Sequence, residues 1–350
     1  MKHTWRRCHF GFVRRGNRSR ILQALAAICV AAPAVASQAG TLAYWRFEGD
    51  GVETPVASTT QVEDTNGRDI NVTFPNAPGI AAVDSSGNGN TLRAWEHSWA
   101  GHAYQSTVPA AVVPQTGAPN NFSVQNTGDY PALFTWSLKS APTTDVETIK
   151  PLAWTIEASI LSTNIGSHRT FVGRDGNRDT GATDGNRAPL YFKTQDGVLQ
   201  ILFTDEAGNV YDLADTTGAI STNTWYNVAA VSDGTTLSLY KDSGAGYQLV
   251  NSMALVAGDT RLNYDDNGST TAGDTQWGWT VGRGRYGGGD LQGDGHGDRW
   301  FGAIDEVRIS DVALSPNQFL FAAVPEPSGL ALAGIVAAVA GLHRRRSASN

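Results

Sequence analysis

Carboxylates at three separate places in the chain could together hold a hard cation. Asp84 begins a loop rich in Gly and Asn, Glu48 follows the first β-type run, and Asp305 lies in the last one. Asp305 alternates there with Ala303 and Val307, which predicts that it faces the core, where a buried charge needs a partner. Because Ca²⁺ prefers carboxylate, amide and carbonyl oxygens, we expect one structural calcium at Asp84, Asp305 and Glu48. The alternative is that Asp84 caps a turn and Asp305 accepts backbone amide hydrogen bonds.

A second group of polar residues could bind a sugar. Asp290, Asp294 and Asp298 are spaced by glycines, and Tyr286 lies in the glycine-rich stretch before them. A sugar site needs an exposed aromatic side chain beside polar groups, so these four residues are the predicted ligand-binding residues. Nearby tryptophans could serve as platforms or could pack in the core: Trp277, Trp279 and Trp300.

Catalytic motifs are absent from the sequence. It has no Glu-x-Asp-x-x-Glu strand, no Gly-x-Ser-x-Gly and no His-Glu-x-x-His. In a regular strand, Asp305 and Glu306 would point to opposite faces. The glycine string from Gly282 to Gly287 resembles a dinucleotide-binding loop, but further glycines follow it in place of a helix. We expect a protein without catalytic activity, although distant carboxylates could still converge.

Short β-type runs separated by Gly, Asn, Asp and Ser must position these side chains, and no convincing amphipathic helix interrupts them. The expected strands are 42–47, 132–138, 154–161, 170–173, 190–194, 198–204, 210–213, 225–232, 236–241, 280–283 and 300–309. Asp-Gly pairs at 196–197 and 233–234 indicate hairpins. The sequence therefore predicts an all-β fold, an antiparallel sandwich or jelly roll over residues 41–323. Residues 96–128, rich in Ala, Pro, Gln, Asn and Gly, are expected to form an insertion or an irregular edge.

Alternation assigns faces within two of these strands. Trp154, Ile156, Ala158 and Ile160 should share one face, and the residues between them should lie on the other. In the last strand, one face is expected to carry these residues together: Phe301, Ala303, Asp305, Val307 and Ile309.

Three segments carry a resemblance to a known family: 44–48 with 84–90, 225–229 with 237–242, and 301–310 with 313–315. Together they resemble the laminin-G-like, concanavalin A-like jelly roll of bacterial surface proteins. The resemblance implies two antiparallel sheets with the first and last strands adjacent. It implies no single activity, because members of the family bind sugars, bind proteins or accompany catalytic domains.

The N-terminal region has the composition of a secretory leader. Seven basic residues and no acidic residue lie in the first twenty positions, an apolar run follows, and Ala34-Val35-Ala36 fits a signal peptidase site. Residues 1–36 are therefore the predicted signal peptide. Both cysteines, Cys8 and Cys29, fall inside it, so the mature chain would form no disulfide.

The C-terminal region combines three features: Pro325-Glu326-Pro327, an apolar run at 329–342, and the basic cluster Arg344-Arg345-Arg346. In this order they resemble the PEP-CTERM sorting signal of Gram-negative bacteria, here assigned to residues 324–346. The resemblance implies an exosortase-type sorting enzyme as a partner, and the short C-terminal transmembrane helix would be the only contact with the membrane. It also implies a cell-surface or extracellular-matrix location and a link to exopolysaccharide.

Charge narrows the choice of partners. The chain has 26 basic and 33 acidic residues, a net charge of −7, and removal of the basic leader makes the rest more acidic. Such a balance argues against nucleic acid and anionic membrane surfaces. The leading hypothesis is an exported, non-catalytic module that binds carbohydrate or matrix polysaccharide. A structural or adhesive protein that binds other proteins is the second hypothesis, and a glycan hydrolase is the third.

Overall fold

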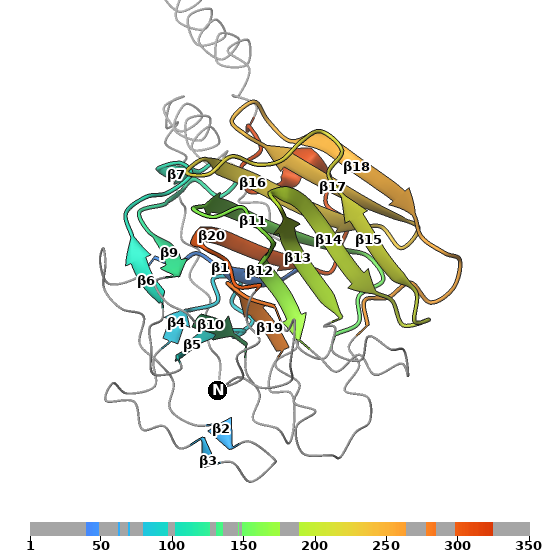
Figure 1. Ribbon diagram of the computed structural model, residues 1–350, viewed down its shortest axis with the longest axis horizontal. Coiled ribbons are helices and arrows are strands. Elements are labelled where there is room, and N and C mark those ends of the chain that lie inside the picture. The colour runs from blue at the N-terminus through green and yellow to red at the C-terminus, as the bar shows by residue number, and fades with distance from the viewer. Residues whose placement is uncertain are drawn as a thin grey trace, which may run out of the picture. The chain divides into compact units, whose positions relative to one another are not determined.

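The chain forms antiparallel strands arranged in two large sheets, with two short strand pairs beside them (Figure 1). The computed structural model describes residues 40–48, 62–63, 69–70, 80–96, 102–126, 131–135, 146, 149–175, 189–263, 278–284 and 298–324. Every strand pair in these sheets is antiparallel. The predicted all-β sandwich class is confirmed.

The first sheet, here called sheet A, has eight strands. Seven follow in the order β18 (Gln248–Ala254), β17 (Thr236–Asp242), β16 (Trp225–Ser232), β11 (Trp154–Ser162), β20 (Gly302–Ser310), β9 (Ser123–Asn126) and β6 (His102–Gln105). The first strand, β1 (Thr41–Trp45), pairs antiparallel with β20, the last. The predicted adjacency of the first and last strands is therefore confirmed.

The second sheet, sheet B, also has eight strands. Their order is β15 (Val210–Ala214), β14 (Val198–Thr204), β13 (Leu190–Gln195), β12 (His168–Asp175), β19 (Gly278–Val281), β10 (Pro131–Phe134), β5 (Leu92–Glu96) and β4 (Ile80–Ala82). The short pairs are β2 (Val62–Glu63) with β3 (Asp69–Ile70), and β7 (Val112–Val113) with β8 (Ala118–Pro119). A 3-10 helix, η1 (Pro316–Gln318), follows β20.

A single apolar core joins the two sheets. Trp154 of sheet A meets Phe203 of sheet B edge-on, with ring centroids 5.3 Å apart. Ile156, Ala158 and Ile160 belong to the same core, so the face predicted for β11 is confirmed. Two tryptophans considered as sugar platforms, Trp279 and Trp300, are buried in this core, and their indole N–H groups donate to backbone carbonyls.

Both expected hairpins are present. Asp196 and Gly197 connect β13 to β14 with φ angles of 49° and 80°, the left-handed conformation that a two-residue hairpin of this kind requires. Gly234 also has positive φ, in the turn between β16 and β17. The segment assigned to an insertion or irregular edge contains β6, β7, β8 and β9, and β6 and β9 stand at one end of sheet A.

The face predicted for Asp305 is wrong because β20 contains a bulge. The register between β11 and β20 shifts after Glu157, and Glu306 has a φ of 48°. The extra residue reverses the alternation, so Ile304 and Val307 both join the core. Asp305 pairs with Ser159 instead, on the outer face of sheet A.

Within the described ranges, no helix is long and apolar enough to cross a membrane. The predicted signal peptide and the segment 325–346 lie outside those ranges.

Candidate functional site

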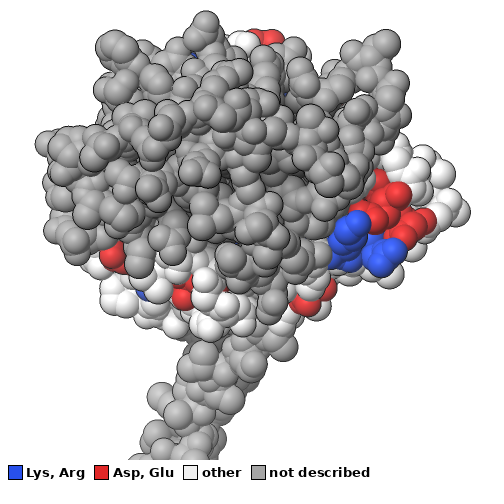
Figure 2. All heavy atoms as spheres, turned by 90° about the horizontal axis from the view of Figure 1, so that it is seen from below, with Lys and Arg blue, Asp and Glu red and all other residues white. Residues whose placement is uncertain are grey.

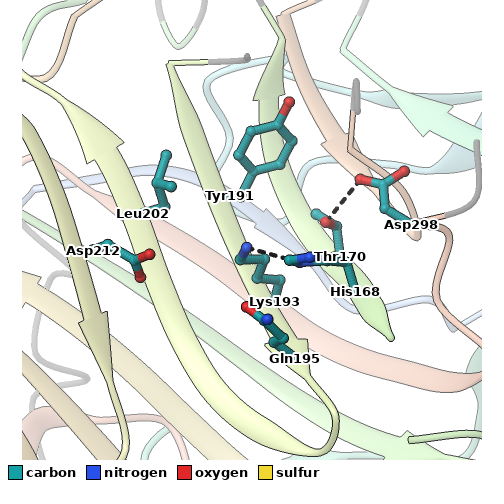
Figure 3. Close-up of a pocket in the computed structure, with 8 residues that line it drawn as sticks. All are labelled: His168, Thr170, Tyr191, Lys193, Gln195, Leu202, Asp212 and Asp298. Atoms are coloured by element: carbon teal, nitrogen blue, oxygen red, sulfur yellow. Dashed lines mark hydrogen bonds between the residues drawn. The ribbon is translucent and has the colours of Figure 1, made fainter. Parts of the chain in front are cut away.

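A hollow of about 170 Å³ lies on the outer face of sheet B, over strands β12 to β15 (Figure 3). It is lined by His168, Thr170, Tyr191, Lys193, Gln195, Leu202, Asp212 and Asp298.

Alternation in β13 explains three of these side chains. Leu190 and Phe192 are fully buried in the core. The residues between and after them, Tyr191, Lys193 and Gln195, therefore project from the opposite face. Because its side chains alternate between the two faces, this one strand supplies an aromatic, a cationic and an amide group to the hollow.

The neighbouring strand β12 contains an irregularity beside the hollow. Its register with β13 shifts between Thr170 and Val172, and both Phe171 and Val172 lie in the core. His168 and Thr170, before the shift, line the hollow. The bulge therefore marks the end of the lining on this strand.

Asp298 is held at the edge of the hollow by β12. The Thr170 backbone N–H donates to the Asp298 carbonyl at 2.6 Å, and the Thr170 hydroxyl donates to Asp298 Oδ2 at 3.0 Å. Gly284 packs beside both Asp298 and Tyr191, since a Cβ there would lie 2.4 Å from each. This close approach requires glycine, and it places the buried carboxylate next to the aromatic ring.

Lys193 and His168 meet within the hollow, as Figure 3 shows, with 3.1 Å between Lys193 Nζ and His168 Nδ1. An ammonium group can only donate, so Nδ1 must be the acceptor. The proton of the neutral imidazole is therefore on Nε2. The pair presents N–H donors, which suit the hydroxyl and carboxylate oxygens of a ligand.

Tyr191 and Leu202 form the apolar part of the lining. They are directly opposite each other on β13 and β14 and pack together as a small cluster outside the main core. Sugars have apolar C–H faces and polar edges, so an aromatic and aliphatic surface beside fixed polar groups is suited to them.

The two carboxylates of the hollow are far apart. Asp212 is on β15, and Asp298 belongs to a segment bridged to β12 on its other side, through Thr170 and Arg299. Four strand spacings separate the backbone positions that carry them, roughly 19 Å at about 4.8 Å each. Glycoside hydrolysis by paired carboxylates needs a separation of about 5–9.5 Å. These two residues do not form such a pair.

Asp84, one of the predicted calcium ligands, is surrounded by hydrogen-bond donors. Its carboxylate accepts the backbone N–H groups of Tyr44, Ser86 and Asn90, at 2.9 Å each, and the Ser86 hydroxyl at 2.8 Å. These contacts close the 84–90 loop onto β1, as in a capped turn.

The other two predicted calcium ligands also accept protein donors. Asp305 Oδ1 accepts the Glu306 N–H, and Oδ2 accepts the Asn120 side-chain amide. Glu48 accepts from the backbone and side chain of Asn121. In the part of the chain that the structure describes, no three His, Asp or Glu side chains are grouped closely enough to hold a metal ion.

Of the predicted sugar ligands, Asp298 lies in the hollow, and Tyr286, Asp290 and Asp294 lie outside the described residues. The residues that sequence reasoning missed are Tyr191, Lys193, Gln195, His168, Thr170, Leu202 and Asp212. For the β13 residues a signal was available, because the strand 190–194 was expected and alternation separates its two faces.

Several solved structures are similar to this chain at low sequence identity. Domain 4 of the extracellular arabinanase AbnA from Geobacillus stearothermophilus, in complex with arabinotriose, is 13% identical, with a TM-score of 0.43, over 80% of this chain and 96% of that chain. The Ruminococcus gnavus IT-sialidase CBM40 bound to α2,3-sialyllactose is 14% identical, with a TM-score of 0.38, over 53% and 89%. The botulinum neurotoxin serotype G binding domain is 9% identical, with a TM-score of 0.43, over 79% and 49%.

Two family descriptions match the sequence, and no curated protein matches it. Residues 323–346 match the PEP-CTERM protein-sorting motif, which indicates export and association with the cell surface. Residues 137–318, just over half of the 350 residues, match the second description. The chain belongs to the concanavalin A-like lectin/glucanases superfamily.

Proposed function

We propose that this protein is an exported, surface- or matrix-associated binding module that takes carbohydrate, such as an exopolysaccharide, in the hollow on sheet B. An exosortase-type enzyme would recognise its C-terminal motif. The observation that carries the proposal is the composition of the hollow. An apolar surface, Tyr191 with Leu202, stands beside N–H donors, a carboxylate and an amide.

The proposed role is non-catalytic. The wide separation of Asp212 and Asp298 supports binding over hydrolysis, because neither carboxylate has the other as an acid–base partner. Neighbouring strands fix most of the lining, and a preformed site of this kind binds without a large ordering cost.

Binding can be tested with the protein purified after export, screened against polysaccharides with and without calcium. Gln195→Ala and Asp212→Ala remove polar groups from the hollow at positions that are not part of the core. Each should weaken glycan binding about threefold to tenfold, the effect of losing one hydrogen bond. Gln248→Ala, at an exposed position of β18 in the other sheet, is the matched control and should leave the affinity unchanged.

Three outcomes would count against binding of glycan in the hollow. Equal losses in the control and hollow variants would show that the glycan binds elsewhere. No glycan binding, together with specific capture of a surface protein, would support the adhesive alternative. Loss of binding on removal of calcium, but not in the hollow variants, would direct attention to the Asp84 and Asp305 region.

A further inference from the structure

The chain does not leave the sandwich where β20 ends. Residues 311–324, here called the C-terminal latch, turn back across the outer face of sheet A. The Leu314 N–H donates to Thr155 Oγ1 at 2.9 Å, and the Thr155 hydroxyl donates to the Val312 carbonyl at 2.7 Å. The latch is therefore bound to β11 from its first residues.

Buried charges hold the next part of the latch. Glu157 Oε1 accepts the Leu320 N–H at 2.7 Å, and Glu157 Oε2 accepts from Arg308 Nε at 2.6 Å. Arg308 also donates to the Gln318 carbonyl at 2.8 Å. An ion pair of β11 and β20 thus satisfies two backbone groups of the latch, and charge-assisted hydrogen bonds of this kind are strong.

An aromatic contact fixes the end of the latch. The Phe319 ring is fully buried against Tyr240 and Tyr247, with centroid distances of 5.3 and 4.8 Å. Ala229 and Val231 of β16 complete this cluster together with Ala322.

These contacts place the latch over the middle of sheet A. Its partners are on β20, β11, β16 and β17, which are consecutive strands inside the sheet order, with other strands on both sides. In Figure 1 the orange-red η1 lies beside β16 and β17. The chain therefore departs from the outer face of sheet A, over strands in the middle of the sheet order.

The sorting motif begins directly after the docked part of the latch. Ala322 is still buried, and its carbonyl accepts from Gln115 Nε2 at 3.2 Å. The motif match starts at residue 323, and Val324 is exposed. Three extended residues span at most about 11 Å, so Pro325 lies no farther than that from the docked Ala322.

We infer that the outer face of sheet A is turned toward the cell surface to which the sorting signal attaches the chain, and that the outer face of sheet B is presented outward. Only Ala323 and Val324 lie between the docked Ala322 and Pro325, so the point of attachment is close to the outer face of sheet A. The hollow on sheet B would then face the medium. Only the use of that hollow rests on the proposed function; the orientation of the two sheets does not.

Single cysteines test this orientation, because the mature chain is expected to contain no thiol. Val210→Cys is exposed on the outer face of sheet B, on the edge strand β15, and does not line the hollow. Ser252→Cys is exposed on the outer face of sheet A, on the edge strand β18, where Ser252 pairs with Ser238. The two edge strands are in contact with each other, so the positions differ mainly in the face they occupy.

The probe is a polymer-bearing, membrane-impermeant maleimide, applied to the cell-bound protein and to protein released from the cells, with the wild type as the blank. On cells, Ser252→Cys should react severalfold more slowly than Val210→Cys, and after release the two should react alike. A Gly/Ser linker of about ten residues after Ala323 adds a span of about 17 Å and should remove the difference. Equal reactivity on cells with the native spacing, or slower reaction of Val210→Cys, would overturn the inference. Failure to bind glycan would leave this result unchanged.

Discussion

At the scale of single residues, one bulge places the carboxylates of Asp305 and Glu306 in different environments. Glu306 accepts from Arg46 at 3.0 Å and from the Tyr44 hydroxyl, so its charge has partners. Asp305 is fully buried and has only amide donors. Burial, and then the neighbouring Glu306 carboxylate, raise the pKa of Asp305 well above its ordinary value. Burial also raises the pKa of Glu306, but hydrogen bonds from Arg46 and Tyr44 oppose that shift, so we assign the proton of this pair to Asp305.

This assignment predicts different results for two similar substitutions. Asp305→Asn should leave the melting temperature near pH 7 unchanged or higher, because an amide resembles the protonated carboxyl. Glu306→Gln should cost about 3 kcal/mol, because it leaves the Arg46 guanidinium without its carboxylate. The pKa of Asp305 is raised on folding, so its stabilising contribution is complete below its unfolded pKa of about 3.9 and is lost as pH rises. Asp305→Asn should remove that part of the pH dependence.

Thermal melts from pH 4 to pH 8, with and without a chelator, distinguish this assignment from the predicted calcium site. Calcium needs the ionised carboxylate. If calcium binds, chelation lowers the melting temperature of the wild type by several degrees, and Asp305→Ala abolishes that response. An unchanged wild-type melt rejects the calcium proposal, and a large loss of stability in Asp305→Asn near pH 7 rejects the protonated carboxyl.

His102 gives a second pH-dependent prediction. Its side chain is buried on β6, its Nε2 has no hydrogen-bond partner among the described residues, and burial lowers its pKa to about 3. The unfolded chain protonates a histidine near pH 6.5, so the free energy of unfolding should fall as pH drops from about 6.5 toward 3, by up to about 1.4 kcal/mol per pH unit. His102→Gln cannot titrate and should lose this contribution. Urea denaturation at pH 7, 5 and 4 measures this contribution. The prediction is contradicted if the free energy of unfolding falls by the same amount in the wild type and the variant as the pH is lowered.

At the scale of elements, the sequence identified most of the long strands, but it missed the seven-residue β18 and several short strands. β11, β14 and β16 have alternating or continuous apolar runs, and their bounds agree with expectation to within a residue. β6 and β9 have only four residues each and carry no such pattern. The bulge at Glu306 could not be foreseen, because no glycine marks it and the tertiary contacts of Glu306 with Arg46 and Tyr44 hold it.

The candidate site was predictable only in part for the same reason. Asp298 was expected to bind ligand, and alternation could have added the outer residues of β13. The contact between His168 and Lys193 depends on the register of β12 against β13, which pairs His168 with Gln195. Neither composition nor spacing determines that register, which shifts at the bulge between Thr170 and Val172.

The hairpin between β13 and β14 carries a prediction at this scale, because it orients the main strand of the hollow. Gly197→Ala should destabilise the protein by more than about 1–2 kcal/mol, the cost of an L-residue at its φ of 80°. The added methyl would also meet Ala219 at 3.2 Å and Ile165 at 3.4 Å. Gly208→Ala is the matched control, with a φ of 83° and nothing within 4 Å. Chemical denaturation should give a lower free energy of unfolding for Gly197→Ala than for Gly208→Ala. Equal losses of stability would show that Ala219 and Ile165 move to accommodate the added methyl group.

At the scale of the whole molecule, the two outer faces of the sandwich differ in structure. The latch covers the outer face of sheet A, and the hollow opens on that of sheet B. Where the described surface is visible in Figure 2, acidic and basic side chains lie next to each other. Ion pairs such as Lys150–Glu206 and Arg261–Asp259 have this mixed character.

The folded domain should extend beyond the end of the family match. That match stops at residue 318, but Phe319 and Leu320 are almost fully buried, and Ala322 packs with the same face. Ending the chain after residue 318 would remove the Phe319 ring, worth about 1.5–3 kcal/mol of burial, and the Leu320 N–H bond to Glu157, worth about 1.5–3 kcal/mol. Together these losses approach the whole stability of an ordinary domain, about 5–15 kcal/mol.

Two truncations test this boundary. A chain of residues 37–324 should be soluble and melt cooperatively, and one of residues 37–318 should aggregate or melt far lower. Phe319→Ala in the longer chain isolates the aromatic contact and should cost about 3–5 kcal/mol. Solubility and calorimetric melting of the three proteins decide the matter. If the shorter chain melts with the longer one, the latch contributes nothing to stability, and the docked exit of the chain from the middle of sheet A loses its support. If only the shorter chain fails, the folded domain extends to Ala322, two residues before the exposed Val324. The sorting motif then joins the folded domain without a spacer.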